Sequence, residues 1–230
     1  MEKTELSFEL EKEIINTLID LAETKYSLKV NSCLPSMLGQ FLYEVNQNRQ
    51  LFTDYQQDYI MVLRSLFTQE VLFVAEAIQF IQSADTNLKV KHDDLIFLSE
   101  IMICSGWDLN ITRNEQEEFI ELLLFLLKSI SFNAGIPLEY LLKQKGGLTN
   151  HLKFLAYRVL KKEIEKETSD DAIYFYIKEN YNQLFSFTNR IRRHITEKYD
   201  VDLSNNEVSY LSLQIQRTQS RYGRHEKLRV

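Results

Sequence analysis

The sequence predicts an all-α protein that contains two copies of one helical module. Only six glycines and two prolines occur in 230 residues, too few for the many turns of an all-β chain. Apolar residues recur at three- and four-residue spacing along most of the chain, which is typical of amphipathic helices. The segment that begins at Asp94 also lines up, without a gap, with the segment that begins at Glu207.

The internal repeat sets the predicted domain boundaries. Residues 94–102 align with residues 207–215 at an offset of 113, and residues 34–45 align with residues 148–159 at an offset of 114. A chain of this length suffices for two domains that each bury a core of their own. We therefore expect one module over residues 1–112, a second over residues 113–222, and a linker over residues 223–230.

The first module shows four stretches with helical periodicity. Pro35 suits the first turn of the second stretch, because an N–H is not needed there, and Asp85 begins a polar turn. The acids at residues 93 and 94 suit a helix N-terminus. The four predicted helical stretches are residues 5–25, 34–45, 56–84 and 90–104.

The second module repeats this order from Glu115. It has about eight additional residues near positions 137–147, and Gly146 and Gly147 predict a break before the helix that carries His151. Asp200 marks the later turn, as Asp85 does in the first copy. We expect two bundles of about five helices each.

The charge of the chain argues against direct binding to nucleic acid. Its net charge is −6, whereas affinity for nucleic acid comes mainly from cationic contacts to phosphate. Residues 1–112 hold 8 Lys+Arg against 17 Asp+Glu, and residues 113–230 hold 19 against 16. This asymmetry is consistent with two solvated surfaces that have diverged, or with modules that present different faces to partners.

Several other classes of protein are disfavoured. Cys33 and Cys104 have no CxxC spacing, so neither zinc nor a disulfide framework is indicated. The acidic N-terminus is unlike a signal peptide, and the most apolar run, residues 122–127, is too short to cross a bilayer. No catalytic or nucleotide-binding motif occurs. We expect a cytoplasmic protein that is not an enzyme and needs no metal or cofactor.

His151 is the histidine whose position attracts most interest. It lies at the edge of an apolar stripe, and Arg158 is two helical turns further along the same face. One interpretation is a half-buried histidine at a helix interface. The other is a phosphoryl acceptor, since a neutral imidazole is a good nucleophile and a nearby arginine can bind the product. The spacing favours a helix-start role for His92, a structural or exposed position for His194, and no role for His225.

Two motifs in the second copy resemble a known family. Residues 147–158 read GLTNHLKFLAYR and residues 206–215 read NEVSYLSLQI. They are similar to the two signatures of the PTS regulation domain, or PRD, a module of sugar-responsive bacterial transcription regulators. Both motifs occur in the expected order, and the first copy is similar mainly through its likeness to the second.

The resemblance implies a tandem of five-helix bundles, homodimerisation and reversible histidine phosphorylation. The phosphoryl donors in such families are the phosphocarrier protein HPr and sugar-specific enzyme II components. The phosphorylation state sets the activity of an attached domain that binds DNA or RNA. We therefore expect the phosphorylation-sensing region of an activator or antiterminator, which meets nucleic acid only through domains outside this chain.

The departures from the family pattern restrict the predicted site. The family has up to two phosphorylatable histidines per module, but the first copy has Met37 and Ile101 at these positions and the second has Gln214 at its second position. Only His151 remains, with Arg158 and Glu207 as candidate partners. We expect the first copy to be a structural or dimerisation module. The alternative is a helical dimerisation scaffold that has lost histidine phosphorylation altogether.

The last residues suggest a longer protein. Residues 227–230 read KLRV and resemble the start of the first strand of an enzyme IIB-like domain, which follows the tandem in multidomain activators of this family. We expect such a domain after residue 230 and a helix-turn-helix part before residue 1.

Overall fold

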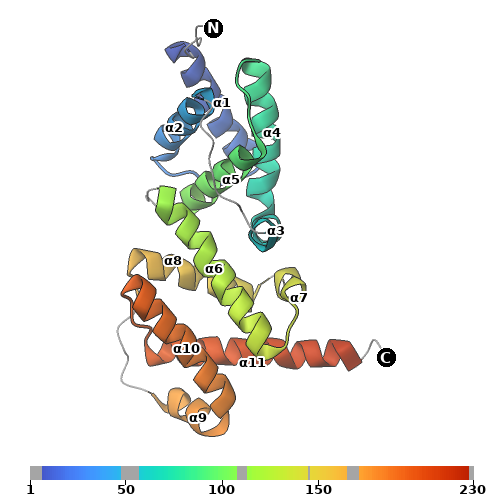
Figure 1. Cartoon of the computed structure of the whole chain (residues 1–230), viewed down its shortest axis with the longest axis vertical. Coiled ribbons are helices and arrows are strands. Elements are labelled where there is room, and N and C mark those ends of the chain that lie inside the picture. Colours follow the sequence, from blue (N-terminus) through green and yellow to red (C-terminus); the bar gives the residue numbers. More distant parts are fainter. Residues whose placement is uncertain (1–6, 48–56, 108–112, 145, 165–170, 228–230) are drawn as a thin grey trace. The chain divides into compact units, whose positions relative to one another are not determined.

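The computed structural model describes residues 7–47, 57–107, 113–144, 146–164 and 171–227 (Figure 1). These residues form eleven α-helices and contain no strand, which confirms the predicted all-α fold. The chain divides into two compact units, Met1–Ile120 and Glu121–Val230. The division lies inside α6 (Arg113–Ala134), eight residues beyond the position that the sequence repeat suggested.

Unit 1 is a bundle in which helices distant in sequence share one apolar core. The helix α5 packs against α2 and α4, and α1 packs against the same two helices. Ile14, Phe41 and Leu98 are completely buried in this core, so each of three helices contributes a full apolar side chain. The helices of unit 1 are α1 (Phe8–Thr24), α2 (Leu34–Asn46), α3 (Gln57–Leu66), α4 (Thr68–Ala84) and α5 (His92–Gly106).

Local signals explain where these helices begin and end. Ser7 caps α1 by accepting a hydrogen bond from the Leu10 amide at 3.3 Å. Asp94 accepts a 2.6 Å hydrogen bond from the Lys91 amide and so stabilises the start of α5. Asp85 ends α4, as its position in a polar turn predicted. Cys33 and Cys104 are free thiols.

Unit 2 is organised around its last helix. The helix α11 packs against α8, α9 and α10, and α10 also packs against α8 and α9. Leu155, Ile191 and Leu211 are fully or almost fully buried between these helices. Besides its part of α6, unit 2 contains α7 (Leu138–Lys143), α8 (Leu148–Lys161), α9 (Ala172–Asn180), α10 (Asn182–Tyr199) and α11 (Asn205–Lys227).

The repeat seen in the sequence extends to a backbone detail. The stretch 56–84, predicted as one helix, is broken at Phe67, where φ is −128° and ψ is 49°. Tyr181 breaks the corresponding stretch of unit 2 between α9 and α10 with φ −132° and ψ 52°. Two aromatic residues therefore make the same break in both units, a feature that apolar periodicity does not encode.

The additional residues of the second copy form a short helix. The helix α7 occupies part of the predicted insertion, and its Tyr140 contacts Tyr222 of α11 with ring centroids 4.8 Å apart. Tyr222 lies near the C-terminal end of α11. The helix continues to Lys227 and so includes residues 223–227 of the predicted linker, whereas residues 228–230 lie outside the described residues. None of the helices in the described ranges combines the length and apolar character that a membrane span requires.

Candidate functional site

The start of α8 positions His151. Gly147 precedes this helix with φ 60° and ψ −115°, a conformation that is open to glycine and strained for any other residue. The carbonyl of Gly147 accepts a 3.0 Å hydrogen bond from the His151 amide. The hydroxyl of Thr149 donates to the Gln144 carbonyl at 2.8 Å. The predicted glycine break therefore sets the first turn in which His151 lies.

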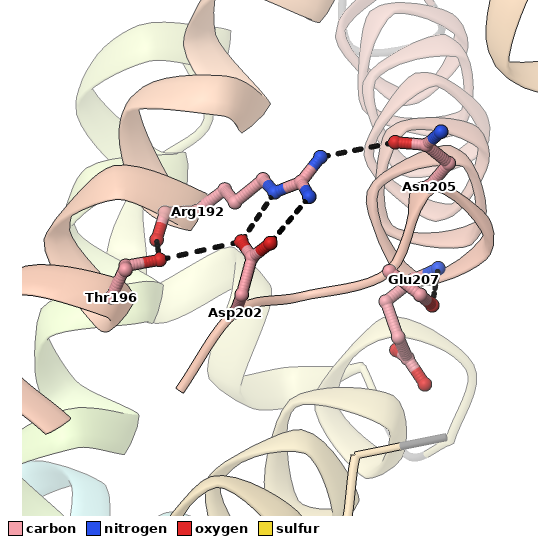
Figure 2. Close-up of polar contacts among 6 residues, drawn as sticks. Arg192, Thr196, Asp202, Asn205 and Glu207 are labelled. Atoms are coloured by element: carbon pink, nitrogen blue, oxygen red, sulfur yellow. Dashed lines mark hydrogen bonds and ion pairs between the residues drawn. The ribbon is translucent and has the colours of Figure 1, made fainter. Parts of the chain in front are cut away.

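A polar network fixes the start of α11 (Figure 2). Arg192 of α10 donates two 2.8 Å hydrogen bonds to the two carboxylate oxygens of Asp202, which lies in the loop before α11. The same guanidinium donates to the side-chain oxygen of Asn205 at 3.0 Å. The Glu207 amide donates to the Ser204 hydroxyl at 3.3 Å. Because both ends of the turn are held, Glu207 has a defined place in the first turn of α11.

Arg158, Glu207 and His151 form one cluster between α8 and α11. Nη1 of Arg158 lies 2.5 Å from Oε1 of Glu207, and Oε2 of Glu207 lies 3.9 Å from Nε2 of His151. The His151 ring packs edge-on against Tyr210 of α11, with ring centroids 4.5 Å apart. The two partner residues predicted from the sequence thus lie beside His151. We refer to His151, Arg158 and Glu207 together as the His151 cluster.

Each member of the His151 cluster keeps unused hydrogen-bonding capacity. Within the described residues, Nε2 of His151, Nε of Arg158 and Oε2 of Glu207 are buried and have no hydrogen-bond partner. Buried polar atoms usually find a partner, so such atoms require an explanation. Three such atoms in one cluster make this the most polar buried group of side chains described between α8 and α11 and the place to look for chemistry.

His151 is neutral at physiological pH. Burial, and to a lesser extent the nearby charge of Arg158, lowers the pKa of its imidazole to about 4. Glu207 does not restore the charged form, because its carboxylate is bound to Arg158 at 2.5 Å and is 3.9 Å from the ring. A neutral imidazole retains a nitrogen lone pair, which is the condition for nucleophilic attack.

Three apolar side chains on the helices of this cluster are exposed. Phe154 is one helical turn after His151 and 56% exposed, while Tyr210 and Leu213 of α11 are 49% and 44% exposed. Gln214, the residue at the second family position, also lies at the start of α8: a Cβ on Gly147 would be 3.7 Å from its side-chain oxygen. Both family positions of unit 2 are therefore close to the first turn of α8.

The corresponding positions of unit 1 have no comparable chemistry. Ile101 is buried in the core, and Met37 is half-buried against the same core. At the positions that align with Arg158 and Glu207, unit 1 has Glu44 and Asp94, both buried. Burial, and to a lesser extent the charges of Asp93 and Glu44, raises the pKa of Asp94. Unit 1 thus has an acid, Glu44, at the position where unit 2 has Arg158. An acid there would repel a phosphoryl group, whereas an arginine can bind it.

The other histidines lie elsewhere. His194 of α10 stacks on Phe125, with ring centroids 3.9 Å apart, and His92 is the first residue of α5. His225 lies in α11; the side chains of His92 and His225 are not described. In the described part of the chain, no group of three His, Cys, Asp or Glu side chains is arranged to hold a metal ion.

Sequence reasoning missed two features of the site. Tyr210 is three residues after Glu207, so helical spacing alone places both on one face and predicts its nearness to His151. The hydrogen bonds from Arg192 to Asp202 and Asn205 could not be predicted from helical spacing. Ten or more residues and a turn separate Arg192 from these two positions. Their contact depends on the tertiary fold.

Comparisons with known proteins match the part of the chain that contains this site. Residues 124–218 match the model of the PRD domain family, a range that includes His151, Arg158, Glu207, Tyr210 and Gln214. The chain is also 23% identical over 211 residues to the transcription antiterminator LicT of Bacillus subtilis (strain 168), which covers 89% of this chain and 73% of that protein. Most of the second unit is therefore similar to a PRD domain.

Proposed function

We propose that this chain, with its PRD-like unit 2, is the phosphorylation-sensing region of a bacterial transcription regulator controlled by the sugar phosphotransferase system. His151 is the phosphoryl acceptor and Arg158 binds the phosphoryl group. The observation that carries the proposal is the neutral, buried His151, whose Nε2 has no hydrogen-bond partner within the described residues and lies in one cluster with Arg158.

The reaction at this site is the transfer of a phosphoryl group from a histidine nitrogen of the donor to Nε2 of His151. The lone pair of Nε2 forms the new N–P bond as the P–N bond of a donor phosphohistidine breaks, and the donor nitrogen keeps that electron pair. The tautomer with its proton on Nδ1 leaves the Nε2 lone pair free. HPr or a sugar-specific enzyme II component supplies the phosphoryl group, so the chain itself acts as a regulator and has no turnover of its own.

The change in charge gives the modification its effect. A phosphoryl group adds about −1.5 to −2 charges at neutral pH and three strong acceptor oxygens. Here it would be introduced beside Phe154, Tyr210 and Leu213, an exposed apolar surface of the kind that often marks protein interfaces. We propose that this surface contributes to a homodimer and that phosphorylation of His151 shifts the dimer equilibrium electrostatically.

Unit 1 is assigned a structural role in this proposal. Met37 and Ile101 cannot accept a phosphoryl group, and Glu44 occupies the position that aligns with Arg158. We propose that unit 1 serves packing and dimerisation within a cytoplasmic regulator. The LicT relative is itself a transcription antiterminator, which supports antitermination or a related form of transcription control as the output.

The test is phosphotransfer from HPr. The chain is incubated with phosphoenolpyruvate, enzyme I and HPr, and its intact mass is measured at neutral pH. We expect one acid-labile phosphoryl adduct, absent in His151→Ala and retained in His194→Ala. An adduct that persists in His151→Ala would contradict the acceptor assignment. If charged HPr and enzyme II components gave no adduct, the scaffold alternative would replace this proposal.

A further inference from the structure

We propose that Glu207 is a built-in competitor of the phosphoryl group: it holds Arg158 in the unmodified protein and yields it when His151 is phosphorylated. This inference rests on the proposed function and concerns the control of the same site. It assigns to Glu207 an inhibitory role, opposite to that of a residue that assists phosphoryl transfer.

The distances place the Glu207 carboxylate within the space that the product needs. Its Oε2 is 3.9 Å from Nε2 of His151, too close for another heavy atom to lie between them. A phosphorus atom bonded to Nε2 carries three oxygens that spread around the nitrogen. A carboxylate oxygen this close to Nε2 leaves little room for a phosphoryl group on its side of the ring, so we infer that the carboxylate moves when the group is added.

Charge repulsion favours movement of the Glu207 carboxylate away from a phosphoryl group on His151. Two anions at this separation repel each other strongly, and the repulsion grows in a partly buried site where the effective dielectric constant is far below that of water. Arg158 is a cation close to both groups: it contacts Glu207 at 2.5 Å, and its charge acts on His151. Its guanidinium has five N–H donors in a planar fork, and its Nε has no partner among the described residues.

The unsatisfied atoms of the cluster fit this exchange. Oε2 of Glu207 and Nε of Arg158 are both buried and lack hydrogen bonds within the described chain, so their pairing is incomplete. A phosphoryl group with three acceptor oxygens can engage Arg158 through two parallel hydrogen bonds. The Glu207 side chain is 11% exposed, so it lies next to a path toward solvent.

The exchange also links the chemistry to the packing of helices. The Arg158–Glu207 ion pair joins α8 to the first turn of α11. When Arg158 binds the phosphoryl group, this connection is lost, while the Arg192–Asp202 contact still holds the preceding loop. Phosphorylation should therefore loosen the first turn of α11 next to Tyr210, which belongs to the exposed apolar surface.

The experiment compares phosphorylation rates of matched variants of the chain. Glu207→Gln removes the competing charge and keeps the shape, whereas Glu121→Gln removes an acid from the ion pair with Lys198 elsewhere in unit 2. With phosphorylated HPr as donor, we expect Glu207→Gln to be modified roughly tenfold faster than wild type or more, given the size of a charge repulsion at this distance. Glu121→Gln should react like wild type, and circular dichroism should report equal folding.

The outcomes separate this inference from the proposed function. If wild type and Glu207→Gln gain the phosphoryl group at equal rates, or if Glu207→Gln reacts more slowly, the competitor role is overturned and the acceptor role of His151 remains. If neither charged HPr nor charged enzyme II components modify any variant, both are overturned. As a second measurement, hydrogen exchange at residues 205–210 should increase when the wild type is phosphorylated; unchanged exchange would contradict release of α11.

Discussion

Arg192 and Asp202 are joined by two hydrogen bonds of 2.8 Å, and this pair closes the turn that leads into α11. The hydrogen bonds from Arg192 lower the pKa of the Asp202 carboxyl below its usual range. A carboxyl with a depressed pKa contributes stability above the unfolded-state pKa of about 3.9, and this contribution is lost as the pH falls through the folded-state value.

Asp202→Asn should weaken unit 2 only slightly at pH 7. The Asp202 side chain is 65% exposed, so loss of the ion pair should lower the free energy of unfolding by about 1 kcal/mol at most. Urea unfolding measures the change, with the exposed Glu197→Gln as a control for simple loss of charge. A decrease in the free energy of unfolding several times larger would show that this turn stabilises unit 2 more than its contacts indicate.

The neutral state of His151 predicts that stability falls on acidification. Its pKa is lowered to about 4 in the folded chain, whereas an unfolded histidine has a pKa of about 6.5. Between these values the unfolded state binds more protons, so the free energy of unfolding decreases as the pH falls. From pH 7 to pH 5, this one residue should account for a loss of about 2 kcal/mol.

His151→Gln separates this contribution from other titrating groups. Denaturant unfolding of the variant and of wild type at pH 7 and pH 5 should give a clearly smaller pH dependence for the variant. His194→Gln serves as the matched control, because His194 is a partly exposed histidine stacked on Phe125, and it should retain the wild-type dependence. Equal pH dependence in all three proteins would show that His151 is not the group that titrates.

The repeat offers a matched pair of core substitutions. Leu98 of α5 and Leu211 of α11 occupy equivalent positions, and both are completely buried. Leu→Ala at such positions removes apolar contacts and leaves a cavity, which costs about 2–5 kcal/mol. Hydrogen exchange followed by mass spectrometry should show faster exchange in α1, α2, α4 and α5 for Leu98→Ala, and in α8 to α11 for Leu211→Ala. Normal protection around the altered leucine would contradict its place in that core.

Periodicity and the repeat predicted the helices well, because apolar spacing reports directly which face of a helix is buried. The apolar spacing continues across Phe67 and Tyr181, so it predicted one helix where the structure has two. A local change of backbone direction leaves this spacing almost intact. The short helix α7 was likewise seen only as additional residues. The breaks at Phe67 and Tyr181 carry no glycine or proline signal, whereas α7 follows Gly135 and Pro137, which indicated a break but not a helix.

The candidate site was predicted in part for a similar reason. His151 and Arg158 share one helix, so spacing alone placed them on one face, and the motif resemblance added Glu207 from a second helix. The resulting distances of 2.5 Å and 3.9 Å depend on how α8 meets α11. The low pKa of His151 depends on burial by the whole unit, which no short stretch of sequence encodes.

Gly147→Ala should disturb the start of α8 although space for a methyl group exists. The nearest atom to an added Cβ, the Gln214 side-chain oxygen, is at an ordinary contact distance of 3.7 Å. The cost comes instead from φ 60° and ψ −115° at this residue, a conformation that alanine adopts only with strain of about 1–3 kcal/mol. Thermal or urea unfolding should show a loss of this size.

The control for this prediction is Gly223→Ala in α11, where an added Cβ meets nothing within 4 Å and φ is not positive. Alanine favours a helix interior over glycine by up to about 1 kcal/mol, so this variant should be as stable as wild type or more so. Because Gly147 accepts the hydrogen bond of the His151 amide, its substitution should also slow phosphorylation by HPr. A Gly147→Ala protein with wild-type stability and rate would show that the start of α8 tolerates another backbone conformation, and that His151 does not depend on it.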